Sequence, residues 1–247
     1  MNATGFSWTR VGAILRKELR EYRRNRFVVV TTMAVLPVVF ILVPTIELIA
    51  IRTSLSGSKL NTRIGLSLVY MLIIPAVVPS VLAAYSMIGE REQGTLEAVL
   101  ITPVHEEEML IGKAFAALLP ALAVAYAVFG VFLAAVAAFA QPAVVSAVLE
   151  RSHLLVQLLF TPLIAGWSIW MGIAISTRVS DVRAAQQLSV VANIPPAAIA
   201  ALMSLDVITP SLGLALGIAA GLLAVDGLAW RVVAAMFDRE RLVTGRR

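Results

Sequence analysis

Long apolar runs separated by short polar segments dominate the chain. Each is close to or above the ~20 residues that an α-helix needs to cross the hydrocarbon core of a bilayer. Backbone groups in lipid must be hydrogen-bonded within their own segment, so these runs are predicted to be helices. The sequence predicts an all-α membrane protein with six transmembrane helices, over residues 27–51, 64–88, 114–140, 154–176, 187–204 and 212–235.

Basic residues are distributed unequally between the two ends of these helices. Four lie on one side: Arg52, Lys59, Arg63 and Arg151. The other side carries the remaining sixteen of the 20 basic residues: Arg10, Arg16, Lys17, Arg20, Arg23, Arg24, Arg26, Arg91, Lys113, Arg178, Arg183, Arg231, Arg239, Arg241, Arg246 and Arg247. Cytoplasmic loops carry the excess of Lys and Arg. We therefore expect both termini in the cytoplasm, and a multi-pass protein of the plasma membrane, the inner membrane in a bacterium.

The residues before the first apolar run have a different pattern. Trp8, Val11, Leu15, Leu19 and Tyr22 recur at three- and four-residue spacing among basic residues. This is typical of an amphipathic helix in the cytoplasmic membrane interface, predicted within residues 1–26. The alternative is a plain topology anchor.

Two acidic residues on this segment, Glu18 and Glu21, could pair with Arg91 or Arg183 and tie the helix to the cytoplasmic loops, or could pair only within the helix. At the other end of the chain, residues 236–247 are predicted to form a basic cytoplasmic tail.

The fifth and sixth apolar runs carry helix-modifying residues. Pro195 and Pro196 follow Asn193 in the fifth run, and proline removes a backbone donor. They predict a helix broken near Pro195 that re-enters from outside, with an ordinary kinked helix as the alternative. The sixth run has glycines four residues apart, which allow close helix packing within the subunit or at a subunit interface: Gly213, Gly217 and Gly221.

The polar segment 89–113, between the second and third runs, is patterned rather than a simple connector. Residues 95–101 predict a short amphipathic helix with Leu96, Val99 and Leu100 on one face. Thr102 can cap a second helix that starts at Pro103 and continues into the third run. Three glutamates at 106–108 would lie in an early turn, where the helix dipole favours negative charge. The alternative is a solvated charged connector.

At this segment the chain resembles a known family. The stretch Gly89-Glu90-Arg91-Glu92-Gln93-Gly94-Thr95-Leu96-Glu97, followed by Thr102-Pro103 and Gly112-Lys113, looks like the first cytoplasmic loop of type-2 ATP-binding-cassette (ABC) exporter permeases. The basic residues 17–26 are similar to that family's elbow helix, and residues 176–189 resemble its second cytoplasmic loop.

The resemblance implies a permease that dimerises, with itself or with a paralogue, and carries cytoplasmic ABC ATPase subunits. Residues 89–113 are called the coupling segment. The resemblance places contacts with the ATPase at Glu90, Arg91, Glu92, Gly94, Thr95, Leu96, Glu97 and Leu100, and at Asp181 in the second loop. The acidic residues 106–108 depart from the family pattern, which leaves the charge of the matching ATPase surface open.

Candidate chemistry within the chain is sparse. The P-loop pattern requires Gly-Lys followed by Ser or Thr, and here Gly112-Lys113 is followed by Ala114. There is no cysteine, and the two histidines, His105 and His153, have no spacing that suits a metal or a catalytic triad. We expect no catalytic residue, metal or cofactor in this chain and no nucleic-acid partner. ATP and Mg²⁺ are expected in the partner subunit, and a membrane-bound enzyme is the least favoured class.

The resemblance also implies a substrate pathway lined by the first, second and fifth runs. Its polar candidates are Thr31, Thr32, Tyr70 and Asn193. Aromatic residues make up 7% of the chain. A sugar-polymer channel would benefit from more of them, so a hydrophobic or amphipathic substrate, such as a drug or a lipid, ranks above a polysaccharide.

The alternative function is an ATP-independent secondary carrier or a membrane scaffold. A proton-coupled carrier needs an intramembrane carboxylate, and the candidates are Glu47 and Asp226. Structural roles are favoured for both: Glu47 would reach the outer interface, and Asp226 would pair with Arg231 or a neighbouring loop.

Overall fold

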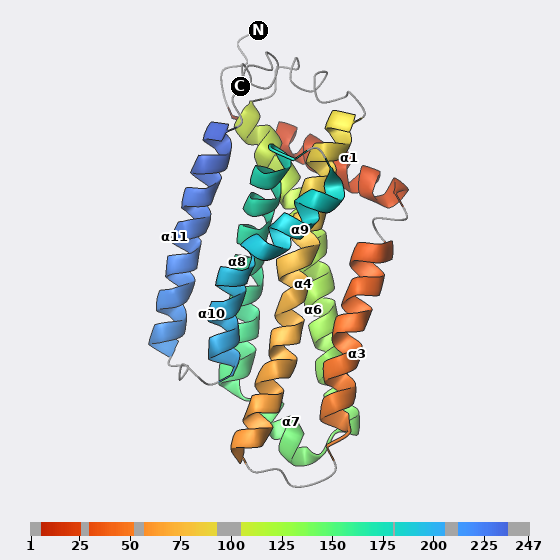
Figure 1. Cartoon of the computed structure of the whole chain (residues 1–247), viewed down its shortest axis with the longest axis vertical. Helices are drawn as coiled ribbons and strands as arrows, with labels where there is room; N and C mark the ends of the chain where they lie inside the picture. Colours follow the sequence, from red (N-terminus) through yellow and green to blue (C-terminus); the bar gives the residue numbers. More distant parts are fainter. Residues whose placement is uncertain are drawn as a thin grey trace.

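The computed structural model describes residues 6–25, 30–51, 57–92, 105–179, 181–205 and 212–236, and all regular structure in them is helical (Figure 1). This confirms the predicted all-α class. The elements are α1 (Trp8–Arg24), η1 (Thr31–Val35), α3 (Leu36–Ile49), α4 (Gly57–Glu92), α6 (Glu106–Phe139), α7 (Pro142–Val148), α8 (Arg151–Ser176), α9 (Val182–Ala192), α10 (Ile194–Ser204) and α11 (Leu212–Met236).

Five helical stretches are long and apolar enough to cross a membrane, so the chain is a multi-pass membrane protein. They are Thr31–Ile49, Lys59–Glu90, Glu106–Phe139, Arg151–Ser176 and Gly213–Ala234. The remaining predicted span, 187–204, is divided between α9 and α10, which have 11 residues each. A break near Pro195 is thereby confirmed. The total of six spans stays a prediction, and the expected re-entrant connection lies at 206–211, outside the described residues.

Hydrogen bonds from α8 stabilise the break between α9 and α10. Pro196 has no N–H group, so it cannot donate to the carbonyl of Ala192 four residues earlier. The indole N–H of Trp167 donates to that carbonyl instead, at 2.9 Å. The side-chain amide of Asn193 donates to the carbonyl of Ser189 at 2.7 Å and to the hydroxyl of Ser168 at 3.3 Å. The break is therefore a defined structural feature.

The bundle is organised around α4. This helix packs most extensively on α8 and also contacts α3, α6, α9 and α10, while α11 packs mainly on α8. Close approach of α4 and α8 depends on Gly172, where an added Cβ would lie 3.0 Å from the backbone of Ser80. In Figure 1, α1 runs across the long helices at one end, and α11 finishes at that same end.

The first span contains a π-helical turn. In η1 the N–H of Leu36 donates to the carbonyl of Thr31, five residues earlier. The α-helix resumes at once, with Pro37 in its first turn and Pro44 in its interior, and both prolines are buried. Most of the exposed side chains after the turn are apolar: Val38, Val39, Leu42, Val43 and Ile46.

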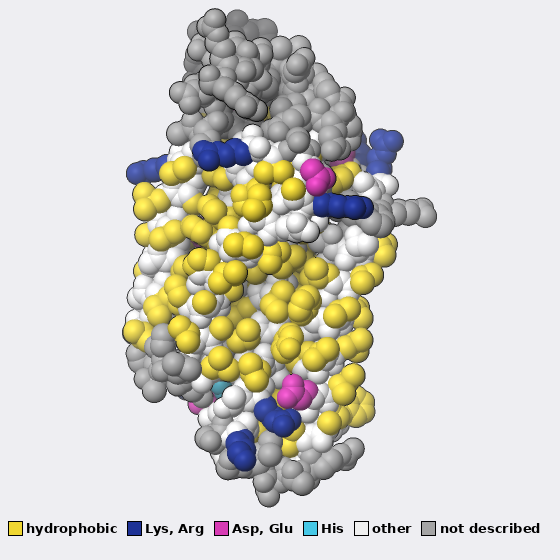
Figure 2. Space-filling view, viewed as in Figure 1, with side chains coloured by type: hydrophobic (Ala, Val, Ile, Leu, Met, Phe, Trp, Pro, Cys, Tyr) yellow, Lys and Arg dark blue, Asp and Glu magenta, His cyan; other side chains and the backbone are white. Residues whose placement is uncertain are grey.

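The surface explains why this chain needs lipid. Figure 2 shows a broad hydrophobic band over the long helices, with Lys and Arg side chains gathered above and below it. At the end opposite α1, an exposed ion pair joins Arg63 and Glu47 at 3.4 Å. Glu47 thus lies at the membrane boundary, consistent with the interfacial position expected for it.

Candidate functional site

The described ends of the coupling segment meet at α1. The segment leaves α4 at Glu92 and enters α6 at Glu106, and α1 packs against α6. Five of the predicted ATPase contacts lie outside the described residues: Gly94, Thr95, Leu96, Glu97 and Leu100. Glu90, Arg91 and Glu92 form the last turn of α4. The prediction that a helix of the segment continues into the third span is confirmed by the unbroken helix α6. Its expected start at Pro103, with Thr102 as the cap, is wrong, because His105 is extended and caps a helix that begins at Glu106.

A buried charge cluster joins α1, α4 and α6. The ammonium of Lys113 lies 2.8 Å from Glu18 Oε1 and 2.8 Å from Glu90 Oε2. It also donates to the hydroxyl of Ser86 at 2.7 Å, and that hydroxyl donates to Glu18 Oε2 at 2.7 Å. The side chains of Lys113, Glu18 and Glu90 are 2%, 1% and 5% exposed. One lysine therefore connects α1 to both described ends of the coupling segment.

The fourth charge of the cluster is Lys17. Its side chain is 41% exposed and lies between the other three charges and solvent. Lys17 pairs with Glu90, and its Nζ also lies 3.4 Å from Glu18 and 3.3 Å from Glu21. With Lys17 included, two carboxylates are balanced by two ammonium groups. Such balance matters because a buried charge without a partner is strongly destabilising. Lys17, Glu18, Glu90 and Lys113 are together called the charge cluster.

The charges of the cluster shift the pKa values of Glu18 and Lys17. Burial alone would raise the pKa of Glu18, but Lys113, Lys17 and the hydroxyl of Ser86 together outweigh burial and hold that pKa below its ordinary value. Partial burial alone would lower the pKa of Lys17, whereas the hydrogen bond to Glu90 and the nearby carboxylates raise it. Both groups are thus stabilised in their charged forms.

Further polar contacts fix the C-terminal half of α1 against α4. The hydroxyl of Tyr22 donates to the carbonyl of Leu82 at 3.3 Å, and the amide of Asn25 donates to the hydroxyl of Tyr85 at 2.5 Å. Tyr22 is buried and belongs to the largest hydrophobic cluster of the bundle. This half of α1 is therefore held by packing as well as by charge.

A second ion pair fixes the N-terminal end of α1 to the start of α6. The guanidinium of Arg10 donates from Nε and Nη2 to the two carboxylate oxygens of Glu108, each at 2.7 Å. The backbone N–H groups of Ser7 and His105 also donate to this carboxylate, at 2.6 and 3.2 Å. Glu108 is fully buried by these contacts. One of the acidic residues that departs from the family pattern thus has a partner inside the chain.

Gly112 explains how α1 comes so close to α6. A Cβ at Gly112 would lie 2.7 Å from Cγ2 of Ile14 and 3.3 Å from the carbonyl oxygen of Val11. Only glycine fits there without displacing α1. The neighbouring Lys113 can reach Glu18 because Gly112 lets the helices approach, so the Gly112-Lys113 pair has a structural role.

The expected pairing of Glu18 and Glu21 with Arg183 is not found: Arg183 is exposed and makes no ion pair with either glutamate. Glu21 pairs within its own helix, with Lys17, as the alternative had it, and Glu18 pairs with Lys113. The side chain of Arg91 lies outside the described residues. Sequence reasoning missed Lys113 as a site residue. The signal that could have found it is a lysine at the very start of a long apolar run, where a buried ammonium requires acidic partners.

The start of α9, in the predicted second loop, packs beside the same end of α4. Asp181 caps α9 by accepting a hydrogen bond from the N–H of Ala184 at 3.1 Å. Ala185 of α9 is buried against Ala84 and Ile88 of α4. Ile88 is two residues before Glu90, so α9 and the coupling segment both reach the last turns of α4.

The predicted pathway residues are distributed over several elements. Thr31 is exposed and Thr32 buried in η1, and π-turns are frequent at functional sites. The ring of Tyr70 on α4 lies 6.4 Å from that of Phe40 on α3. Asn193 is buried at the α9–α10 break, with its side-chain amide bonded to Ser189 and Ser168. Their role in substrate passage stays a prediction.

The intramembrane carboxylate Asp226 faces α8. An added Cβ at Gly166 would lie 2.9 Å from Asp226 Oδ2. Among the described residues, Oδ1 of Asp226 is buried without a hydrogen-bond partner, and no ion pair joins Asp226 to Arg231. The expected pairing with Arg231 is therefore not found. Within the same residues, no group of three or more His, Asp or Glu side chains could hold a metal ion.

The chain matches a model of a known protein family. A family model described as "ABC-2 family transporter protein" matches residues 14–194. The matched region runs from within α1 to the start of α10 and includes the charge cluster, the coupling segment and the second loop. No curated protein matches the chain.

Proposed function

The chain belongs to the ABC-2 family of transporter proteins, and on that premise we propose that it is the membrane permease of an exporter driven by a separate cytoplasmic ATPase. Family membership and the five apolar helices establish a transmembrane permease of an ABC transporter. Export, ATP coupling through the coupling segment, and the substrate are the parts that we propose.

The observation that carries this proposal is the attachment of α1 to both described ends of the coupling segment. Glu90 at the end of α4, and Glu108 and Lys113 at the start of α6, are held by side chains of α1 through buried ion pairs. A force applied to the residues between these ends would therefore act on α1, α4 and α6 together. A solvated connector would not require such contacts at its two ends.

The mechanism derives from this attachment. ATP binding would bring two ATPase subunits together, and their surfaces would displace residues 90–101. The second loop, in which Asp181 caps α9, would transmit a smaller part of the motion through α9 to α4. A ligand shifts a conformational equilibrium only by its different affinity for the two states, and ATP with Mg²⁺ on the partner would supply that difference.

The transporter is proposed to contain two permease subunits, either two copies of this chain or this chain with a paralogue. Both termini would lie in the cytoplasm, with six spans and α1 as an interfacial elbow helix. The substrate is proposed to be hydrophobic or amphipathic, such as a drug or a lipid, since the pathway candidates provide only a few polar groups: Thr31, Thr32, Tyr70 and Asn193. Polysaccharide ranks second.

Cysteine cross-linking tests the contact with the ATPase. The chain contains no cysteine, so single cysteines can be introduced without background. We expect Glu97→Cys to cross-link to a co-expressed ABC ATPase and to react with a membrane-impermeant maleimide only in inverted vesicles. Lys59→Cys, at the opposite end of α4, should react only in intact cells and should give no cross-link. Labelling of Glu97→Cys from outside would contradict the proposal.

Uncoupling variants test the role of the segment in transport. Gly94→Trp and Glu92→Lys should leave membrane insertion intact but abolish substrate-dependent export, because the ATPase would no longer move the segment correctly. Glu150→Lys, an exposed charge reversal at the opposite end, serves as the matched control and should export normally. Normal export by both coupling variants would show that the segment has another role.

One observation favours a second candidate, a proton-coupled carrier. Asp226 is an intramembrane carboxylate with a buried oxygen that has no hydrogen-bond partner among the described residues. Transport that follows a proton gradient without any ATPase, and that Asp226→Asn abolishes, would favour the carrier. Export that depends on the ATPase and survives Asp226→Asn would favour the permease.

A further inference from the structure

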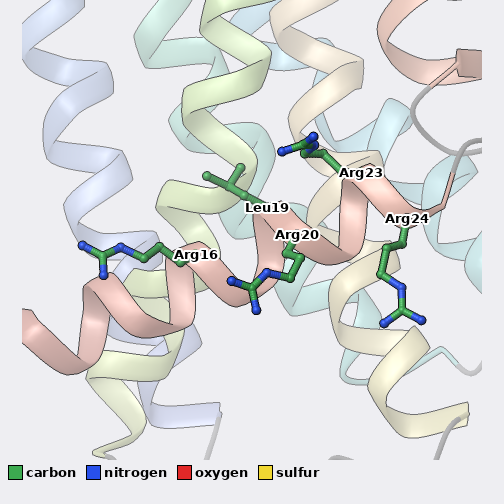
Figure 3. Close-up of a pocket in the computed structure, with 5 residues that line it drawn as sticks. All are labelled: Arg16, Leu19, Arg20, Arg23 and Arg24. Carbon is green, nitrogen blue, oxygen red and sulfur yellow. The ribbon is translucent and has the colours of Figure 1, made fainter.

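The face of α1 opposite its packed side carries four exposed arginines. Arg16, Arg20 and Arg23 lie at positions i, i+4 and i+7, which places them on one side of the helix, and Arg24 is adjacent. In Figure 3, Leu19 and Arg23 extend above the α1 ribbon, Arg20 and Arg24 extend below it, and Arg16 runs along it. A single groove, called the arginine groove, is lined by Arg16, Leu19, Arg20, Arg23 and Arg24.

The arginine groove carries positive charge without internal compensation. Among the residues that the structure describes, none of its four arginines forms an ion pair, although Lys17 on the same helix forms three. Four guanidinium groups brought together on one helix repel one another. A binding partner with negative charge would therefore be favoured here.

The position of α1 indicates which kind of partner this is. The helix crosses the long helices near the end of the hydrophobic band, where lipid headgroups would lie (Figures 1 and 2). At its start, Trp8 and Phe6 are 67% and 43% exposed, with their ring centroids 5.1 Å apart. Exposed tryptophan is enriched at the membrane interface, because its ring is apolar and its N–H is polar.

We propose that the arginine groove binds the phosphate-bearing headgroups of anionic phospholipids in the inner leaflet. Guanidinium groups bind phosphate through two parallel hydrogen bonds, and Leu19 provides an apolar contact for the lipid's glycerol region. The opposite face of the same helix holds Glu18 in its ion pair with Lys113, and Lys17 and Arg10 form their ion pairs from the side of the helix between the two faces. A lipid bound on the outer face thus stabilises α1 in the position that fixes both ends of the coupling segment.

Lipid binding can be measured on the purified full-length chain in neutral detergent, without ATPase or substrate. Native mass spectrometry and thermal unfolding would be recorded with dioctanoyl phosphatidylglycerol, dioctanoyl phosphatidylcholine and inorganic phosphate. The groove variant is Arg16→Gln/Arg20→Gln/Arg23→Gln. The control variant, Arg178→Gln/Arg183→Gln/Arg231→Gln, removes the same charge from the same end of the molecule.

We expect saturable binding of phosphatidylglycerol to the wild-type chain and weak binding of the other two ligands. Each basic residue near an anionic surface contributes about fivefold in affinity, so the groove variant should bind at least about tenfold more weakly. The control variant should change affinity by less than about threefold. A third variant, Arg16→Lys/Arg20→Lys/Arg23→Lys, keeps the charge but loses the two-bond geometry, and should bind with intermediate affinity.

Three results of the lipid measurement would overturn the inference: equal losses in the groove and control variants, phosphatidylcholine binding as well as phosphatidylglycerol, or inorganic phosphate competing as well as the lipid. A separate pull-down with the co-expressed ATPase gives a fourth. A groove variant that keeps lipid binding but no longer captures the ATPase would assign the groove to the protein partner. Because neither export nor ATP is involved in the lipid measurement, its failure would leave the proposed permease function unaffected.

Discussion

The two ends of the α4–α6 pair are stabilised in opposite ways. At the α1 end, the charge cluster and the Arg10–Glu108 pair bury four carboxylate or ammonium groups to 5% exposure or less. At the far end, the ion pair of Glu47 with Arg63 is 36% and 47% exposed, and apolar contacts of α7 through Val144 and Val148 predominate. Buried ion pairs are directional, whereas apolar contacts tolerate small displacements. From this difference we expect the α1 end to resist displacement more strongly than the far end.

Removal of Lys113 should have the largest effect on this comparison. Lys113→Met leaves Glu18 and Glu90 buried with only Lys17 nearby, so we expect a loss of about 3–5 kcal/mol in the free energy of unfolding. The measurements are thermal or denaturant unfolding in detergent and hydrogen exchange of the α1 amides. At the far end, Arg63→Met should cost no more than about 1 kcal/mol.

A triple variant tests whether the loss of stability comes from unpaired buried charges. Lys113→Met/Glu18→Leu/Glu90→Leu removes the buried charges together and should recover most of the lost stability, since a buried ion pair is often no more stable than apolar residues of similar volume. Equal costs for Lys113→Met and Arg63→Met would mean that the two ends do not differ in how they are stabilised.

Enlarging Gly112 should have an intermediate effect. The added methyl group of Gly112→Ala would press on Ile14 and push α1 away from α6, at a cost of about 1–3 kcal/mol. Gly130→Ala on the same helix is the matched control, because nothing lies within 4 Å of its added Cβ. That change should be neutral or stabilising by up to about 1 kcal/mol, as alanine favours the helix. Unfolding of the two variants in parallel gives the comparison, and a neutral Gly112→Ala would contradict close packing at this point.

The smallest expected effect is on pH dependence. The folded state lowers the pKa of Glu18 from its ordinary 4.5, so its contribution is fully present above about pH 4.5 and is lost as the pH falls through the folded value. Glu18→Gln cannot titrate. The difference in melting temperature between wild type and Glu18→Gln should therefore be constant from pH 7 to 5 and should narrow in more acidic solution. A difference that widens below pH 4.5 would contradict the assigned charge state.

The sequence predicted the helices better than the contacts between them. Apolar runs and the spacing of Val11, Leu15 and Tyr22 depend on local periodicity, which is visible in one dimension. The break near Pro195 was also predictable, because a missing N–H group has a local consequence. The short helix α7 was not foreseen, because its seven residues are too few to show a period.

The charge cluster could not be predicted because its members are far apart in the chain. Glu18 and Lys113 are separated by 95 positions, and only the folded bundle brings them together. Glu108 looked like a solvated residue at a helix start, and its burial depends on Arg10, 98 positions away. A surface charge and a buried, paired charge look alike in a single sequence, and partner choice is decided by tertiary packing.

The π-turn in the first span sets the rotational phase of the rest of that helix. One extra residue in a helical turn corresponds to about 100° of rotation and ~1.5 Å of rise. With that residue accommodated in η1, Pro37, Pro44 and Leu48 face the bundle, and the valine-rich side of α3 faces outward. If the turn adopted α-helical geometry, the valine-rich side of α3 would rotate about the helix axis by more than a quarter of a revolution. The α-helical hydrogen bonds of α3 itself would not change. The first span thus has a built-in angular offset, located in the five residues Thr31–Val35.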